Sequence, residues 1–379
     1  MKFRDFIDVR DGTHDSPKSV SGIGYPLVTT KHLGNGFIDL SNTNNISEED
    51  YIAINKRSKV DQFDILISMI GTVGSVYQER QSQPGYAIKN VGLLKFNGDE
   101  TLSNYVYYWL KSSNGQNEIK VRLKGTTQQF LSLTELRNLT LELPSREEMN
   151  LAVKPLMILD QKMYSLGSIN DNLLELADAT FKKNYEQQVG NQKLETLATV
   201  KGGKRLPKGA PLTEVKTQHP YLRITDYSKN GVPSVQSMQY ITEEVFDKIS
   251  RYVINEGEVF LSIVGTIGIV DLIDERLDNA SLTENAVKIH AQTTAMAHYL
   301  YLYLRSDEGR HEIDSRTVGT TQKKLAITRI KDFDVGVISE TDLQEFERTV
   351  SPLINMVLAN RSEIDTLVQI RDSLLQELI

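Results

Sequence analysis

The chain lacks the residues and patterns on which several protein classes depend. It has no cysteine, which excludes a disulfide framework, a thiol nucleophile and a cysteine-ligated zinc or iron–sulfur site. The six histidines show no His-x-x-x-His spacing of the kind that binds zinc. No run of about 18 uncharged apolar residues is present, so we expect no membrane span. The first residues contain no apolar segment typical of a signal peptide, and we predict a cytoplasmic location.

Signatures of common DNA-processing and nucleotide-binding enzymes are also missing. The sequence contains no Pro-Pro pair, so it lacks the Asn/Asp-Pro-Pro-aromatic loop of adenine methyltransferases. It has no Pro-Asp pair to begin a restriction-nuclease motif, and neither of the usual glycine-rich phosphate loops. We therefore predict a non-catalytic binding protein that itself holds no metal or cofactor. Two alternatives remain: a stand-alone DNA-processing enzyme with an unrecognised nuclease site, and a structural two-domain scaffold or adhesin.

The net charge of −7 argues against DNA binding only if it is spread evenly over the chain. Segments 146–190 and 340–379 together carry the whole excess of acidic residues. The remainder is neutral overall and contains clusters of lysine and arginine. Charge distribution is therefore compatible with a nucleic-acid partner.

A long internal repeat organises the sequence. The segment Gly71-Thr72-Val73-Gly74 recurs as Gly265-Thr266-Ile267-Gly268, and Gly125-Thr126-Thr127-Gln128 recurs as Gly319-Thr320-Thr321-Gln322. Both recurrences lie 194 positions later, which is too long a period for a solenoid. The repeat indicates two copies of one unit, each with a globular part and a helical part.

The fold class that follows is α/β (α+β), with four segments in the chain. Residues 1–145 and 191–338 contain short apolar runs between glycine and asparagine turns, which predicts two domains of mixed strands and short helices. Segments 105–111 and 299–305 are expected to be buried helices. Residues 146–190 and 339–379 are expected to form two long helices, each on the order of 60 Å.

Each long helix has an apolar stripe at spacings of three and four residues. We expect the two stripes to pack together as an antiparallel coiled coil, although each helix could instead pack on its own domain. The predicted packing residues are Leu159, Met163, Leu166, Leu173 and Leu176 in the first helix, and Leu353, Val357, Leu367, Ile370 and Leu374 in the second.

Basic residues flank both Gly-Thr-Thr-Gln segments and open the second unit. Lysine and arginine neutralise DNA phosphates, whereas glutamine can bond an adenine edge in the major groove. A solvated charged surface explains any one such run equally well, but the repetition favours DNA contact. The candidate DNA-binding residues are Lys31, His32, Thr72, Lys120, Arg122, Lys124, Thr126, Thr127, Gln128, Lys201, Lys204, Arg205, Thr266, Arg316, Thr320, Thr321, Gln322, Lys323 and Lys324.

The order of these motifs resembles the specificity (S) subunits of type I restriction–modification systems. The opening Asp11-Gly12-Thr13-His14-Asp15-Ser16-Pro17-Lys18 is similar to the start of a target-recognition domain in that family. The junction Leu143-Pro144-Ser145-Arg146-Glu147-Glu148 and the helix ends around 174–182 and 370–375 are similar to its conserved helices. The second junction departs from the pattern, because Val337-Ile338-Ser339-Glu340 has no proline.

The resemblance implies a function and partners. Each domain would recognise one half of a bipartite, asymmetric site in double-stranded DNA. Two methyltransferase subunits would dock on the helices and bind S-adenosylmethionine. Two restriction subunits, where present, would bring ATP and magnesium chemistry.

Overall fold

The computed structural model describes residues 1–34, 36–126, 128–185, 191–227, 231–319 and 323–379. These form two compact units: unit 1 comprises Met1–Gln161 with Val368–Ile379, and unit 2 comprises Lys162–Leu367. Both long helices contribute residues to both units, so the units do not follow the four predicted segments. The predicted boundaries at 145, 190 and 338 stay a prediction.

Unit 1 is built on two small sheets. The first has the antiparallel order β1-β7-β4-β5 and the second the order β3-β2-β6, in which β2 and β6 are parallel. The strands are β1 (Asp8–Asp11), β2 (Tyr25–Val28), β3 (Asn44–Ile46), β4 (Ile65–Ser68), β5 (Val76–Gln78), β6 (Ala87–Ile88) and β7 (Val91–Lys95).

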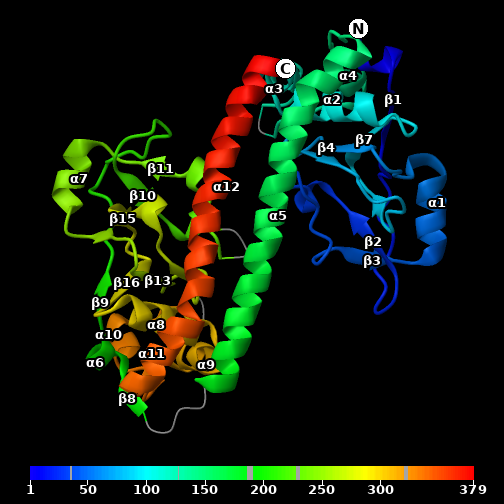
Figure 1. Ribbon diagram of the computed structural model, residues 1–379. Coiled ribbons are helices and arrows are strands. Elements are labelled where there is room, and N and C mark those ends of the chain that lie inside the picture. The colour runs from blue at the N-terminus through cyan, green and yellow to red at the C-terminus, as the bar shows by residue number, and fades with distance from the viewer. Residues whose placement is uncertain (35, 127, 186–190, 228–230, 320–322) are drawn as a thin grey trace. The chain divides into compact units, whose positions relative to one another are not determined.

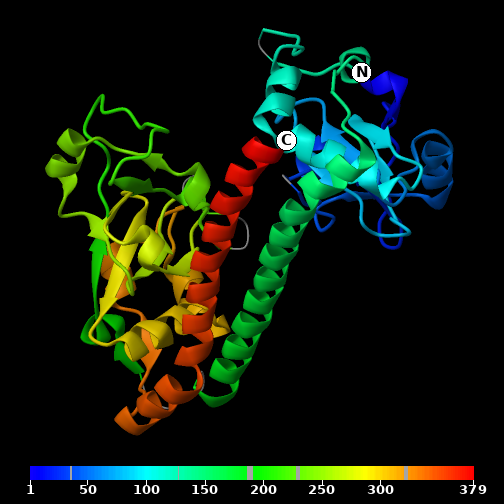
Figure 2. The ribbon, with the colours of Figure 1, turned by 45° about the horizontal axis from the view of Figure 1, so that its top comes forward.

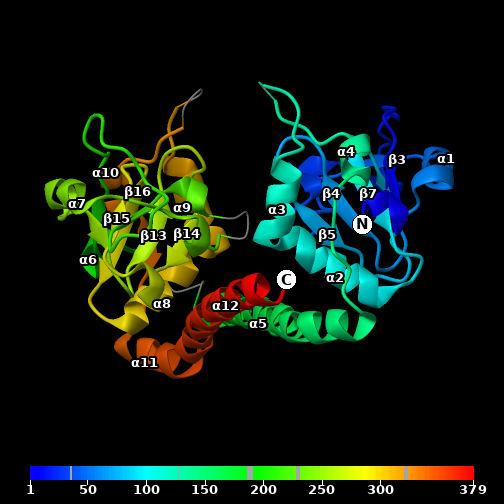
Figure 3. The same cartoon turned by 90° about the horizontal axis from the view of Figure 1, so that it is seen from above.

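Helix α2 (Glu100–Lys111) lies along one face of the first sheet in unit 1 (Figures 1 and 3). It extends the expected 105–111 helix toward the N-terminus because the Asp99 carboxylate accepts the Leu102 N–H at 3.1 Å and caps the first turn. The remaining helical segments of the globular part are η1 (Phe3–Asp5), η2 (Thr30–His32), α1 (Glu48–Ser58), α3 (Ser113–Lys120) and α4 (Leu133–Arg137).

Unit 2 repeats the main sheet in the order β9-β16-β13-β14, again antiparallel, and α8 (Thr294–Arg305) covers it. Its smaller sheets have the orders β11-β10-β15-β12 and β17-β8. The strands are β8 (Asn191–Lys193), β9 (Ala198–Gly202), β10 (Pro220–Leu222), β11 (Gln239–Tyr240), β12 (Val253–Ile254), β13 (Val259–Ser262), β14 (Val270–Leu272), β15 (Ala280–Leu282), β16 (Ala286–Ala291) and β17 (Asp334–Gly336). The shorter helical segments are α6 (Leu194–Leu197), η3 (Ile224–Asp226), η4 (Val235–Ser237), α7 (Glu243–Ile249), η5 (Glu275–Leu277), α9 (Asp307–Arg316) and α10 (Ile327–Lys331).

The structure confirms the duplication of a mixed helix-and-strand unit. Helices α2 and α8 begin 194 positions apart, as do α3 and α9, α4 and α10, β4 and β13, and β5 and β14. Buried residues are concentrated on the same elements in both units. One sequence pattern has therefore produced one local architecture twice.

The long helices pair in antiparallel fashion (Figure 2). In unit 2, α5 (Arg146–Asn184) and α12 (Ser351–Leu378) are joined by an ion pair between Lys162 and Glu363 at 2.9 Å and by a hydrogen bond from Asn360 to Asn170 at 2.7 Å. In unit 1, Arg371 contacts Asp160 at 3.2 Å. Increasing numbers on α5 meet decreasing numbers on α12, so the predicted antiparallel pair is confirmed.

The second helical segment is not one continuous helix, as predicted, but two. Helix α11 (Glu340–Thr349) ends before α12, which begins at Ser351. Pro352 explains the break, since it has no N–H to bond into a preceding turn and is favoured in the first turn of a helix. Pro155, in contrast, lies inside α5 without interrupting it.

The predicted apolar stripe is only partly buried. Leu166 and Val357 are buried and most of the other stripe residues are half-buried, but Leu176 is 53% and Ile370 45% exposed. The packing predicted for those two residues is wrong within this chain. The helices also pack on the globular cores, and there Ala177 and Phe181 of α5 are the buried residues instead. Both packing alternatives therefore apply, on different helix faces.

Candidate nucleic-acid interface

The Gly-Thr-x-Gly motif of unit 1 is the turn between β4 and β5. Gly71 and Gly74 have φ angles of +79° and +91°, which favour glycine. The Ser68 hydroxyl donates to the Thr72 carbonyl and accepts the Ser75 N–H at 2.9 Å, which fixes the loop from inside. The motif is thus a structural turn that leaves the Thr72 side chain exposed.

The residues on either side of the Gly-Thr-Thr-Gln segment pair as the two arms of a hairpin beside this turn. Lys124 and Phe130 exchange backbone hydrogen bonds of 3.0 and 2.9 Å, and Phe130 forms a β-bridge with Ile70. The Leu131 N–H then donates to the Met69 carbonyl at 2.8 Å. Two motifs separated by about fifty positions are therefore neighbours at one end of β4.

Unit 2 has the same arrangement with equivalent residues. Val318 and Lys324 close the hairpin with hydrogen bonds of 2.9 and 2.8 Å, and Lys324 bridges to Val264 beside the Gly-Thr-Ile-Gly turn. In that turn the Ser262 hydroxyl donates to the Thr266 carbonyl at 2.6 Å. Each unit thus presents one composite surface made of two adjoining loops.

Several predicted DNA-binding cations are paired with acids of the same unit. Arg122 forms an ion pair with Glu118 at 2.8 Å, and Arg316 pairs with Glu312 at 2.7 Å. In the sequence, the basic runs contain no acidic residue, so their positive charge looks unpaired. One helical turn, however, brings residues four positions apart together. These two arginines are half-buried.

Two further predicted cations are paired but remain mostly exposed. Lys124 contacts Glu135 at 2.9 Å with 54% of its side chain exposed, and Arg205 contacts Glu284 at 2.6 Å with 81% exposed. Such exposed pairs are worth little and can open for a phosphate. Both therefore stay candidates for DNA contact.

The other predicted contact residues divide by exposure. Those that are exposed are Lys31, Thr72, Lys120, Thr126, Gln128, Lys201, Lys204, Thr266, Lys323 and Lys324. Lys204 also lies over the Tyr252 ring, with its ammonium nitrogen 5.5 Å from the centroid. Thr127, Thr320, Thr321 and Gln322 lie outside the described residues. His32 is a correction, because it is only 5% exposed and its Nδ1 accepts the Thr29 N–H at 2.9 Å.

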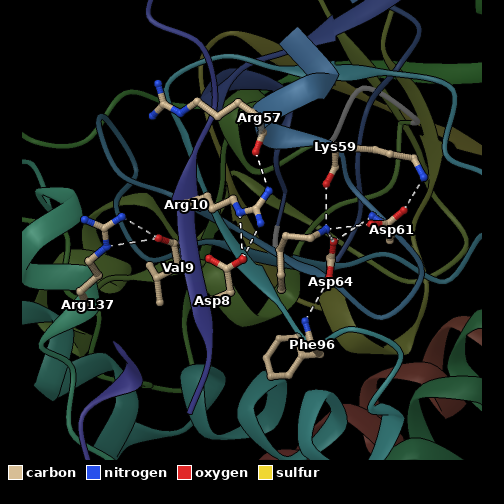
Figure 4. A network of polar contacts seen from close by, with 10 residues as sticks. Asp8, Val9, Arg10, Arg57, Lys59, Asp61, Asp64, Phe96 and Arg137 are labelled. Atoms are coloured by element: carbon tan, nitrogen blue, oxygen red, sulfur yellow. Dashed lines mark hydrogen bonds and ion pairs between the residues drawn. The ribbon is translucent and has the colours of Figure 1, made fainter. Parts of the chain in front are cut away.

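A charge cluster in unit 1 has the residue types of a nuclease site, but two of its three members are buried (Figure 4). Lys95 donates to Asp64 at 2.6 Å and to Asp61 at 2.8 Å, and Asp64 also accepts the Phe96 N–H at 3.1 Å. Burial raises the pKa of the Asp64 carboxyl above its ordinary value in spite of Lys95. Asp64 is 0% and Lys95 7% exposed, so these two side chains join the start of β4 to the end of β7 and are not accessible to a substrate.

One cationic position beside the motif loops has no signature in the sequence. Arg310 on α9 lines a cavity of about 480 Å³ together with Thr266, Gly268, Tyr227 and Arg305. In the sequence, Arg310 follows Asp307 and Glu308 and belongs to no basic run. Only the fold shows that it lies beside the Gly-Thr-Ile-Gly turn.

No group of three or more histidine or acidic side chains is arranged to hold a metal ion in the part of the chain that the structure describes. Among the same residues, no helix is long and apolar enough to cross a membrane.

Known proteins share both the sequence pattern and the fold. The chain is 24% identical over 313 residues to the specificity subunit of the type I restriction enzyme MjaIX of Methanocaldococcus jannaschii, covering 74% of this chain and 69% of that protein. It is 27% identical over 131 residues to the EcoBI specificity subunit of Escherichia coli, covering 35% and 27% respectively. The crystal structure of a type I restriction–modification S subunit from M. genitalium covers 100% of this chain and 95% of its own, with a TM-score of 0.55 and 16% identity.

A family model matches both copies of the repeat. The type I restriction modification DNA specificity domain matches residues 1–174 and again 187–338. The two matches contain both copies of the adjoining motif loops. The chain therefore belongs to the family of type I restriction–modification DNA specificity domains.

Proposed function

We propose that this chain selects the DNA sequence for a type I restriction–modification complex, with each domain binding one half of a bipartite, asymmetric site. The observation that carries the proposal is the duplicated pair of adjoining motifs, in which equivalent flanking positions form the same backbone bridges but carry different side chains. Different side chains on the same frame recognise different base edges. Two joined but unlike domains would give a site that is not palindromic.

The composition of the loops supports a DNA surface. Thr72, Thr126 and Gln128 in unit 1 are exposed and offer short donors and acceptors to bases or phosphates. Thr266, Lys323 and Lys324 are exposed in unit 2. The glycine turns let the backbone come close to a ligand in both units.

The helices support docking of two methyltransferase subunits. Leu151 and Ile158 on α5 and Met356 on α12 are 68%, 57% and 52% exposed, and exposed apolar side chains of this kind favour a protein partner. The partner subunits would bind S-adenosylmethionine and transfer the methyl group. Two restriction subunits, in a complex that cuts DNA, would add ATP and magnesium. This chain would bind none of these cofactors itself.

The test is co-expression with the methyltransferase subunit of the same system, followed by co-purification and sequencing of the methylated DNA. We then exchange residues 191–338 for those of a relative with another target. One half of the methylated motif should change and the other should persist. A change in both halves, or in neither, would contradict the assignment of one half-site to each domain.

A single-residue variant tests the same assignment in the second domain. Gln322→Ala is expected to cost on the order of 1–3 kcal/mol of binding free energy if this side chain bonds a base. The lost binding free energy should concern only the half-site that residues 191–338 recognise. Gln128→Ala is the matched variant in the first domain and should affect the other half-site.

A further inference from the structure

The residues that flank the two Gly-Thr-Thr-Gln segments form the same backbone bridges but differ in charge. Lys124 of unit 1 corresponds, 194 positions later, to Val318 of unit 2, and Phe130 corresponds to Lys324. These residues face each other across the hairpin in both units, since each pair exchanges two backbone hydrogen bonds. The cation and the apolar side chain have therefore exchanged strands.

In unit 1 the hairpin presents an apolar pair. Phe130 and its bridge partner Ile70 are 38% and 39% exposed, although both are large apolar side chains. The lysine of this hairpin, Lys124, is compensated by Glu135 at 2.9 Å. Apart from this ion-paired lysine, segment 124–130 contains no charged residue.

In unit 2 the same place is cationic. Lys323 and Lys324 are both exposed, and no carboxylate among the described residues forms an ion pair with either. The position of Glu135 is occupied by Arg329, so the acid that compensates the unit 1 lysine has no counterpart. On the preceding helix the difference is reversed, because Lys120 corresponds to Asp314. The asymmetry therefore belongs to the hairpin itself.

We propose that the two hairpins engage DNA by different chemistry. This inference rests on the proposed function. Lys323 and Lys324 neutralise phosphates, whereas Ile70 and Phe130 make apolar contacts in the groove, for which a thymine methyl group is the suitable partner. Each neutralised phosphate releases counterions and contributes about −0.9 to the slope of log affinity against log salt, but an apolar contact contributes no such term. Unit 2 then supplies most of the hairpins' salt-dependent affinity.

The test compares salt slopes for the full-length chain on a duplex that carries the mapped target site. The double substitution Lys323→Ala with Lys324→Ala should reduce the magnitude of the slope by about 1–2. Phe130→Ala should weaken binding several-fold and leave the slope unchanged. The reciprocal change, Gln129→Lys with Phe130→Lys, should increase the magnitude of the slope by about 1–2. Lys248→Ala is the matched control, because Lys248 is an exposed, ion-paired lysine on α7 outside both hairpins, and this variant should change the slope little.

Two results would overturn the inference while the proposed function stands. One is a wild-type slope in the variant that lacks both lysines, and the other is a reduced slope in Phe130→Ala. A wild-type chain that binds no duplex even at low salt would instead contradict the proposed function, and the inference with it. All the substituted side chains are exposed or at the hairpin rim, and circular dichroism of each variant checks the fold.

Discussion

His298 shows how burial changes the chemistry of a single residue. It lies in α8 with 2% of its surface exposed, and its Nδ1 has no hydrogen-bond partner among the described residues. Burial favours the neutral imidazole and lowers the pKa of His298 from 6.5 to about 4. The equivalent residue in unit 1 is Asn104, which does not titrate.

This shift predicts a loss of stability in acid. Between pH 6.5 and about 4 the unfolded chain binds a proton at His298 that the folded protein does not. The contribution of the neutral side chain is therefore complete above pH 6.5 and is lost as the pH falls to about 4. We expect a decrease of about 3 kcal/mol in the free energy of unfolding from this residue.

The measurement is urea unfolding of wild type and His298→Leu across that pH window. The difference between the two proteins should grow by about 3 kcal/mol as the pH falls, in favour of the variant. At pH 8 the imidazole is neutral in both the folded and the unfolded protein. Wild type and variant should then differ only through the packing of the substituted side chain. Parallel pH profiles would show that the histidine is not held neutral by the fold.

At the scale of elements, one buried ion pair joins α12 to the sheet of unit 2. The Arg361 guanidinium contacts the Asp271 carboxylate of β14 at 2.9 Å, and the two residues are 6% and 1% exposed. Burial raises the pKa of the Asp271 carboxyl, although Arg361 opposes this. Each charge therefore depends on the other for its tolerance in the interior.

Removal of one partner should be far more damaging than removal of both. Arg361→Met leaves a buried carboxylate without its cation and is expected to destabilise unit 2 by about 3–5 kcal/mol. The double variant Arg361→Met with Asp271→Leu should recover most of that loss. Hydrogen exchange at β14 and α12 measures the effect.

An exposed ion pair provides the control for this prediction. Arg348 contacts Glu345 on α11 with 76% and 49% of the side chains exposed, and Arg348→Met should cost less than about 1 kcal/mol. If the double variant were as unstable as Arg361→Met, the loss would arise from packing and not from an unpaired charge.

At the scale of the whole molecule, the chain is expected to recognise DNA without altering it. In the charge cluster that most resembles a nuclease centre, Lys95 is engaged in ion pairs with Asp61 and Asp64, and both Lys95 and Asp64 are buried. Purified chain should neither transfer methyl groups from S-adenosylmethionine nor cut DNA with magnesium. Methylation should appear when the methyltransferase partner is added. Methyl transfer or cleavage by the chain alone would contradict this expectation.

The sequence by itself determined the repeat, the mixed helix-and-strand class and the antiparallel helix pair. These depend on patterns that are local along the chain: a constant offset of 194 positions, apolar residues at helical spacing, and glycines where φ must be positive. It could not show that the long helices also pack on the domains, which exposes Leu176 and buries Ala177. A stripe gives one helix face, but only the folded neighbours decide how much of the circumference is covered.

The tertiary structure alone decided which candidate residues are available to a ligand. It buried His32, paired Arg122 and Arg316 with acids, and brought Arg310 beside Thr266. It also set the two motifs of each unit side by side through the Ile70–Phe130 and Val264–Lys324 bridges. The physical reason is distance: charge compensation and burial depend on separations in space of a few ångströms, and residues far apart in sequence reach them only after the chain has folded.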